Sequence, residues 1–268
     1  MSLTERVVAV IPARYGSQRL PGKPLADLCG KPMIQHVYER VAQARTIDWC
    51  LVATDDERIA ATVRAFGGHA VLTPENLPTG TDRVAFVARS LRDATIVVNV
   101  QGDEPLMEPA MIDEAVRVVL SNPDTAVGTL VREIENVQDL TNPGVVKVVL
   151  DAEKRCLYFS RSPIPFVRDR QSSSSHPVYE KVAGTDGWLK HHRYYKHIGL
   201  YVYRRDFLLR LSEMAQTPLE AAEQLEQLRI LEHGHTIQAA VTNYDSTPVD
   251  TPADLERVRP LMKVHNER

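Results

Sequence analysis

The sequence predicts an α/β fold in which a mainly parallel central sheet is covered on both faces by helices and followed by a smaller, more antiparallel part. Two patterns predict it: apolar runs alternate with helical patterns before residue 125, and closely spaced strand patterns follow. At 268 residues and 43% hydrophobic composition, the chain can bury a sizeable core. We expect one domain in three parts, at about 1–125, about 126–248 and 249–268.

The first part of the chain alternates strictly between the two patterns. Strands are expected at 7–11, 50–53, 70–72 and 96–100, and helices at 33–44, 57–66, 82–91 and 110–120. Parallel strands need long crossover connections, which these helices supply. Ligands of such sheets bind beyond the carboxyl ends of the strands, so the loops that follow the strands are the candidate site.

The second part predicts strands at 126–131, 145–150, 156–159 and 198–203, whose short spacing is typical of antiparallel pairing. Residues 168–192 contain four consecutive serines and few apolar side chains, which predicts a mobile surface insertion. A helix is expected over 218–233, with Gly234 just past its end. Thr251 and Pro252 are typical of the N-cap and first turn of a final helix.

Bulk composition excludes several classes of protein. A net charge of −3 argues against a nucleic-acid-binding protein, so any anionic ligand must be held by a local group of cations. The polar start of the chain and the lack of an 18-residue apolar run argue against secretion and membrane insertion. Three widely spaced cysteines indicate reduced thiols, so we expect a cytoplasmic protein.

The loop over 13–25 follows the first predicted strand and carries Arg14, Arg19 and Lys23 together with two glycines. Glycine lets backbone N–H groups approach anionic oxygens, and the three cations supply charge-assisted hydrogen bonds. This combination predicts a polyphosphate site, although a solvated surface loop is the alternative. Five residues separate Gly16 from Gly22, and Pro24 follows Lys23, so neither a Walker loop nor a dinucleotide fingerprint fits.

A carboxylate follows the fourth predicted strand. Asp103 stands in the turn after the buried run 96–100, at the ligand edge of the sheet. Mg²⁺ prefers oxygen ligands and is often held by one or two carboxylates plus substrate phosphates, so a second carboxylate is expected. Asp250, in the loop before the final helix, is the candidate, and the alternative is that it only caps that helix.

Several polar residues of the chain suit an acidic substrate. Arg83 and Arg161 are candidates because arginine forms bidentate bonds with carboxylates. His197 has either a binding role or a purely structural one. Glu226 and Gln227 lie within the predicted helix 218–233 and are further polar candidates. The alternative is that they only form the solvent-exposed, or wet, face of that helix.

Motifs along nearly the whole chain together resemble one enzyme family. They are VAVIPAR (8–14), RLPGKPL (19–25), NVQGDEP (99–105), YFSR (158–161), HIG (197–199), PLE (218–220), LEQLR (225–229) and VDTP (249–252). This set resembles the 3-deoxy-manno-octulosonate cytidylyltransferases, also called CMP-Kdo synthetases, where Kdo is the sugar acid. Only the serine-rich insertion lies outside the resemblance. The chain has Asp82 where the family usually has Glu, and Gly16 where many members have alanine.

The resemblance implies a Rossmann-like three-layer nucleotidyltransferase fold whose smaller antiparallel layer binds the substrate and forms the dimer. It also implies a cytosolic homodimer that uses Mg²⁺, CTP and Kdo to make CMP-Kdo and pyrophosphate for lipopolysaccharide. By this resemblance Arg14, Arg19 and Lys23 hold the triphosphate, with Lys23, Arg14 and Asp103 as the catalytic set. The remaining implied roles are nucleotide contacts by Ala13, Gly80 and Gln101, metal binding by Asp103 and Asp250, and a Kdo pocket of Arg83, Arg161, His197, Tyr201, Glu226 and Gln227.

Two rival functions remain open at this point. One is a cytidylyltransferase for another acidic sugar, such as sialic acid or 8-amino-Kdo. The other is a catalytically silent nucleotide-binding protein that keeps the fold for partner contact. Both candidate metal ligands are present in the chain, which disfavours the silent protein.

Overall fold

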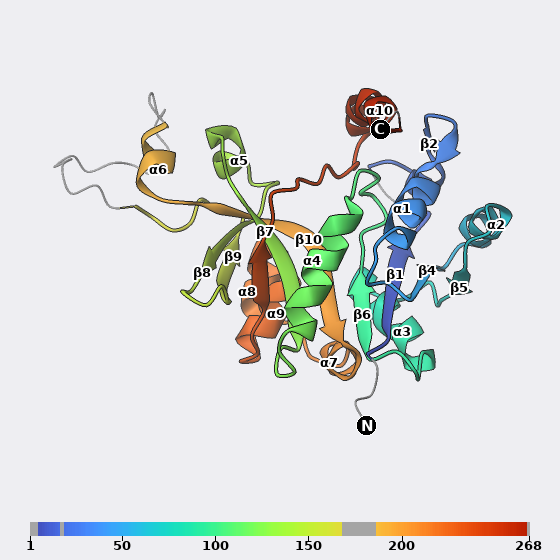
Figure 1. The fold of residues 1–268 in the computed structure, drawn as a ribbon, viewed down its shortest axis with the longest axis horizontal. Helices are drawn as coiled ribbons and strands as arrows, with labels where there is room; N and C mark the ends of the chain where they lie inside the picture. Colours follow the sequence, from blue (N-terminus) through green and yellow to red (C-terminus); the bar gives the residue numbers. More distant parts are fainter. Residues whose placement is uncertain (1–4, 17–18, 168–185, 267–268) are drawn as a thin grey trace.

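A single mixed sheet organises the molecule (Figure 1). The computed structural model describes residues 5–16, 19–167 and 186–266, and within them a nine-stranded sheet has the strand order β11-β7-β10-β6-β1-β4-β5. β1 (Val7–Ala13) lies parallel between β4 (Trp49–Thr54) and β6 (Ile96–Asn99), and β5 (Ala70–Leu72) continues the parallel part. The predicted mainly parallel α/β fold is confirmed.

The antiparallel part joins the same sheet through β10 (Tyr195–Arg204). This strand pairs antiparallel with β6 and with β7 (Val127–Glu133), and β8 (Lys147–Leu150) and β9 (Cys156–Ser160) extend it. β11 (Gln238–Val241), which the sequence pattern did not predict, pairs parallel with β7 at the edge. Because β10 runs against β6, its amino-terminal half lies beyond the carboxyl end of β6.

Helices cover both faces of the sheet, as predicted. α1 (Met33–Ala42), α2 (Glu57–Ala65) and α4 (Pro109–Leu120) pack with Val7, Ala9 and Ile11 on one face. α3 (Gly80–Ser90), α7 (Arg205–Leu211) and α9 (Gln227–Glu232) pack with Val8 and Val10 on the other. A strand buried on both faces needs apolar side chains at successive positions, which explains the uninterrupted apolar run of β1.

The predicted helix over 218–233 is wrong, because the chain forms two short helices there. α8 (Pro218–Glu223) is followed by its C-cap Gln224, which has a left-handed φ of 53°. This conformation interrupts the helix before α9 begins at Gln227. Glu220 closes the capping box of α8 and forms an ion pair with Arg229, at 2.6 Å, that folds α9 back onto α8. Apolar periodicity alone does not reveal such a break.

The other elements that the patterns did not predict are short. They are the 3-10 turn η1 (Lys23–Leu25), the hairpin of β2 (Asp27–Leu28) and β3 (Lys31–Pro32), and the helices α5 (Val137–Thr141), α6 (Asp186–His191) and α7. α6 occupies the end of the predicted insertion 168–192, and residues 168–185 lie outside the described part of the chain. α10 (Pro252–Asn266) is the predicted final helix, and no described helix is long and apolar enough to span a bilayer.

Burial in the sheet predicts a large cost for truncating its core. Leu130, on β7, is fully buried, so Leu130→Ala is expected to lower the free energy of unfolding by about 2–5 kcal/mol. Leu157, on β9, is 58% exposed, and Leu157→Ala should change the free energy of unfolding by less than about 0.5 kcal/mol. Urea denaturation of both variants checks this, and equal costs would contradict the assignment of Leu130 to the core.

Candidate active site

Three segments far apart in the sequence meet at the carboxyl ends of β1 and β6. A Cβ at Gly102 would lie 2.9 Å from the carbonyl oxygen of Pro12, so only glycine lets the turn after β6 pack against the end of β1. The amide of Val249 donates to the carbonyl oxygen of Asp103 at 2.9 Å, which fixes the loop before α10 to the same turn. Figure 1 shows this loop crossing from β11 to α10, and α10 packs on Leu28 and Met33.

Lys23, Asp103 and Asp250 form the centre of the site. The Lys23 ammonium donates to Asp103 Oδ2 at 2.6 Å and to Asp250 Oδ1 at 3.0 Å. Arg19 Nη2 lies 3.0 Å from the same oxygen of Asp250. Burial lowers the pKa of Lys23, but the charge and hydrogen bonds of the two carboxylates outweigh it, so the net pKa is raised. The structure therefore brings together the lysine predicted for phosphate and both carboxylates predicted for metal.

Asp250 does not cap the final helix. Thr251 Oγ1 accepts from the amide of Asp254 at 3.2 Å, and Asp254 Oδ2 accepts from the amide of Thr251 at 2.9 Å. The backbone amide of Asp250 also donates to Asp254, at 3.1 Å, which leaves the Asp250 carboxylate facing Lys23. The predicted N-cap at Thr251 is confirmed, and the capping alternative for Asp250 is wrong.

Two carboxylates that converge on one cation are a suitable donor set for Mg²⁺. Among the described residues no group of three or more His, Cys, Asp or Glu side chains is placed to hold a metal by itself. Mg²⁺ is commonly bound by one or two carboxylates while phosphate oxygens and water fill its other positions. Asp103 and Asp250 therefore fit a metal that arrives with a phosphorylated substrate.

The predicted nucleotide residues gather around the end of β1. Ala13 is the last residue of β1, and Arg14 Nη2 donates to the carbonyl oxygen of Leu77 at 2.6 Å. This bond ties the loop to the segment that leads into α3, where a Cβ at Gly80 would lie 3.4 Å from Pro12. Asp82 forms the capping box of α3 with Thr79: each side chain accepts a hydrogen bond from the backbone amide of the other. Aspartate can therefore replace the glutamate that is usual in a capping box.

Gln101 lies on the other side of the turn, against β10. Its Cγ lies 3.7 Å from the Cβ that a side chain at Gly199 would have. Glu104 Oε1 lies 3.6 Å from the same point. The missing side chain at Gly199 therefore lets Gln101 and Glu104 approach the backbone of β10 closely. Burial and the neighbouring Asp103 raise the pKa of Glu104 to about 8. Glu104 lies within the motif at 99–105, but the resemblance implied no role for it, and its place directly after Asp103 was the signal for one.

Arg83 is fully buried, and its guanidinium is already engaged. Its Nη2 donates to Asp55 Oδ2 at 2.7 Å and its Nη1 donates to Thr73 Oγ1. Burial lowers the pKa of Arg83, although Asp55 partly opposes that shift. The charge of Arg14 lowers this pKa further, so the two guanidinium groups lie near each other. Its predicted contact with the sugar stays a prediction.

A wall of polar side chains lies where β10, α3 and the start of α9 meet. His197 and Tyr201 project from the same face of β10, with ring centroids 5.1 Å apart, and Tyr201 stacks on Tyr203 at 5.8 Å. Glu226 hydrogen-bonds Thr81 and Thr79, and burial raises its pKa. Glu226 thus faces the inside of the protein, and the wet-face alternative is wrong. Gln227, beside it, is 8% exposed.

Sequence reasoning missed three members of this wall, Asn99, Thr81 and Tyr203. Asn99 Nδ2 donates to Thr81 Oγ1 at 3.3 Å, and Thr81 also hydrogen-bonds Tyr203. Within the described residues the buried Tyr201 hydroxyl has no hydrogen-bond partner. A buried hydroxyl without a partner costs about 1–3 kcal/mol, which a ligand that hydrogen-bonds it would recover.

Arg161 binds the carboxyl end of α8. Its Nε donates to the carbonyl oxygen of Glu223 at 2.8 Å, and its Nη1 donates to that of Pro143 at 3.0 Å. Beside it Lys147 is fully buried, and burial followed by the charge of Arg161 lowers the lysine pKa to about 8. The Glu223 carboxylate accompanies the two cations: its charge raises the Lys147 pKa in part, and its Oε2 accepts from the Arg161 amide at 2.9 Å. Lys147 follows an apolar pair in a strand pattern, and no sequence signal separated it from a surface lysine.

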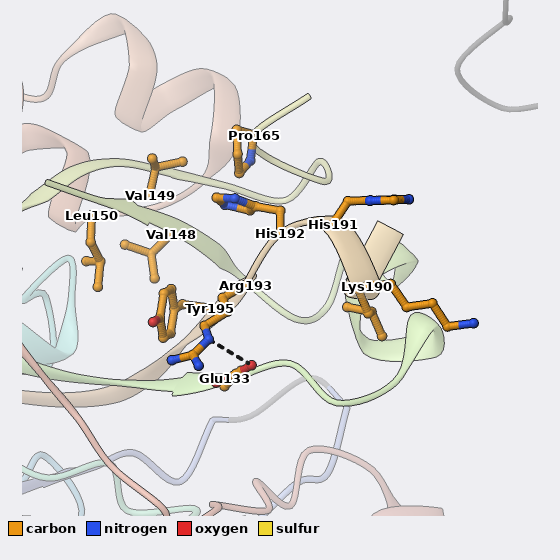
Figure 2. Close-up of a pocket in the computed structure, with 11 residues that line it drawn as sticks. Glu133, Val148, Val149, Leu150, Pro165, Lys190, His191, His192, Arg193 and Tyr195 are labelled. Atoms are coloured by element: carbon orange, nitrogen blue, oxygen red, sulfur yellow. Dashed lines mark ion pairs between the residues drawn. The ribbon is translucent and has the colours of Figure 1, made fainter. Parts of the chain in front are cut away.

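A separate cavity of about 530 Å³ lies between β8, β10 and α6 (Figure 2). Val148, Leu150, Tyr195, His191, His192 and Arg193 are among the residues that line it. Arg193 Nε lies 3.9 Å from Glu133 Oε1, which also lines the cavity. None of the residues that line it belongs to the predicted site.

His197 gives the site a pH-dependent stability. Thr129 Oγ1 donates to the carbonyl oxygen of Leu200 at 2.8 Å and so accepts from His197 Nε2 at 3.0 Å, which places a proton on Nε2. Burial lowers the His197 pKa to about 3. Since the unfolded state then binds the proton more readily, this contribution is present above about pH 6.5 and is lost as the pH falls toward 3.

Replacing this histidine should flatten the dependence of stability on pH. His197→Asn is expected to lower the slope of unfolding free energy against pH between pH 6.5 and 4, by at most about 1.4 kcal/mol per pH unit. Urea denaturation at several pH values measures it, with exposed His69→Asn as the control. An unchanged slope in His197→Asn would show that the imidazole is charged in the folded protein.

Comparison with known proteins agrees with this geometry. The family model described as "Cytidylyltransferase" matches residues 8–237. A 3-deoxy-manno-octulosonate cytidylyltransferase of Geobacter metallireducens is 53% identical over 94% of this chain and 96% of its own length, and one of Geotalea uraniireducens is 52% identical over 96% and 99%. A solved CMP:2-keto-3-deoxy-manno-octonic acid synthetase complexed with CTP has a TM-score of 0.87 and 42% identity, covering 97% of this chain and all of that one. The chain therefore belongs to the cytidylyltransferase family, as a member of its 3-deoxy-manno-octulosonate cytidylyltransferases.

Proposed function

We propose that this protein transfers CMP from CTP to Kdo, giving CMP-Kdo and pyrophosphate for lipopolysaccharide synthesis. The observation that carries the proposal is the convergence of Lys23, Asp103 and Asp250 at the carboxyl ends of β1 and β6. Relatives that share about half of the sequence over nearly the whole chain carry the name of that activity.

The reaction joins two anions, so positioning and charge neutralisation dominate it. The anomeric hydroxyl oxygen of Kdo forms a bond to the α-phosphorus of CTP. The bond from that phosphorus to the bridging oxygen breaks, and pyrophosphate leaves with its electron pair. The hydroxyl proton passes to a base in the site, and no covalent enzyme intermediate is needed.

The chain's own residues divide into a nucleotide side and a sugar side. Arg14, Arg19 and Lys23 would hold the triphosphate, and Ala13, Gly80 and Gln101 would contact the nucleoside. On the sugar side we propose Arg83, Arg161, His197, Tyr201, Glu226 and Gln227. The orphaned Tyr201 hydroxyl suits a sugar hydroxyl. Arg161 is proposed for the Kdo carboxylate, because arginine forms bidentate bonds with carboxylates.

Asp103 and Asp250 are proposed to hold Mg²⁺. When bound, the metal would neutralise phosphate charge and polarise the α-phosphate. Lys23, 15% exposed between the two carboxylates, is placed to bind phosphate at the same point. A cytoplasmic location and a homodimer complete the proposal, and both rest on the resemblance.

Loss of one carboxylate should damage turnover more than nucleotide binding, because charge stabilisation grows in the transition state. Asp103→Asn is expected to lower kcat by more than about tenfold, or about 1.4 kcal/mol of barrier, in a pyrophosphate-release assay with CTP, Kdo and Mg²⁺. Asp93→Asn, at an 85% exposed position beside Arg6, is the matched control. Activity of Asp103→Asn within tenfold of wild type would remove Asp103 from the proposed metal site.

The same assay identifies the sugar. Kdo is expected to support the highest kcat/KM among Kdo, 8-amino-Kdo and sialic acid. A preference for either other sugar would reassign the substrate, and no turnover with any of them would favour a silent nucleotide-binding protein.

A further inference from the structure

One ammonium group holds both proposed metal ligands. Lys23 Nζ lies 2.6 Å from Asp103 Oδ2 and 3.0 Å from Asp250 Oδ1, so each carboxylate turns an oxygen toward the same cation. The three side chains are partly shielded, with exposed fractions of 15%, 25% and 32% for Lys23, Asp103 and Asp250. Charges shielded in this way are screened little by salt.

A divalent cation and this ammonium compete for the same oxygens. Mg²⁺ binds carboxylate oxygens at about 2.0–2.1 Å and demands near-octahedral geometry. Each carboxylate oxygen that faces the centre of the site already accepts a hydrogen bond from Lys23. A second cation there would also be repelled by the lysine charge across a partly desolvated gap.

The backbone beneath Lys23 is held independently of its side chain. The Lys23 amide donates to Leu20 O at 3.0 Å, the Ala26 amide donates to Lys23 O at 3.1 Å, and Pro24 is buried. Gly22 has a left-handed φ of 68°, which only glycine adopts readily and which sets the turn. The side chain of Lys23, four carbons long, can therefore swing to a phosphate while its backbone stays in place.

We propose that Lys23 is a displaceable counter-ion: it neutralises Asp103 and Asp250 until the phosphates of an incoming nucleotide take its ammonium, and only then does a divalent cation bind both carboxylates tightly. This rests on the proposed function. It follows that the free protein binds a divalent cation weakly, and that nucleotide and metal bind cooperatively because each removes an obstacle to the other.

Arg19 provides the matched control. Within the described part of the chain its guanidinium pairs with Asp250, at 3.0 Å, and not with Asp103, and it is 66% exposed. Removing Arg19 deletes a positive charge near the site but leaves the bridge between the carboxylates. Comparing the Mn²⁺ affinities of Lys23 and Arg19 variants therefore separates two effects. One is the loss of an ammonium that occupies both carboxylates, and the other is the loss of a nearby positive charge.

Mn²⁺ titrated without nucleotide, followed by calorimetry and by the loss of the free-ion electron spin resonance signal, tests the proposal. Lys23→Met is expected to bind Mn²⁺ at least about tenfold more tightly than wild type, a change of about 1.4 kcal/mol. Arg19→Met should gain less than about threefold, and the gain of Lys23→Met should vanish when Asp103→Asn is added. Lys23→Gln, which keeps a neutral donor, should also gain affinity, and it serves as the second variant if Lys23→Met does not fold.

Equal or weaker Mn²⁺ binding by folded Lys23→Met or Lys23→Gln would overturn the proposal. An equal gain in Arg19→Met would overturn it as well, because the effect would then be general. If wild type binds Mn²⁺ as tightly as the lysine variants while CTP turnover still requires a divalent cation, only the counter-ion role fails. If no form binds Mn²⁺ and turnover needs no metal, the magnesium part of the proposed function fails with it.

Discussion

The ion pairs from Lys23 to Asp103 and Asp250 depend on three loops that meet at one edge of the sheet. Lys23 follows the loop after β1, Asp103 follows β6, and Asp250 precedes α10. Parallel strands place the first two loops at one edge, and the packing of Val249, Leu255, Val258 and Met262 on Leu28 and Met33 brings the third there. Charged groups from distant parts of the sequence thus meet because apolar packing elsewhere holds their backbones.

The two sides of the site differ in how the protein prepares them. On the nucleotide side Lys23 pairs with two carboxylates. On the sugar side the polar groups are desolvated, since burial lowers the pKa of His197 and raises that of Glu226. This division suits a polyanion held by charge and a sugar recognised through its hydroxyls.

Sequence patterns predicted the parallel half of the fold well, because strands buried on both faces leave apolar runs such as that of β1. They failed where local conformation depends on one residue, as at Gln224, or where a strand is short and at an edge, as with β11. At the site, position after a strand end singled out Arg14, Arg19, Lys23 and Asp103, whereas Asp250 was a candidate from its place before the final helix and from the family resemblance. Asn99, Thr81, Tyr203 and Lys147 were missed, because their importance comes from tertiary neighbours that no spacing encodes.

The central claim is that Asp103 and Asp250 jointly bind a divalent cation beside the nucleotide phosphates. A crystal structure of the protein with CTP and Mn²⁺, using anomalous scattering to locate the metal, tests it most directly. We expect an anomalous peak within coordination distance of both carboxylates and of phosphate oxygen, with the Lys23 ammonium moved from the carboxylates to a phosphate. A nucleotide bound with Lys23 still bridging Asp103 and Asp250, and with no anomalous peak beside them, would contradict it.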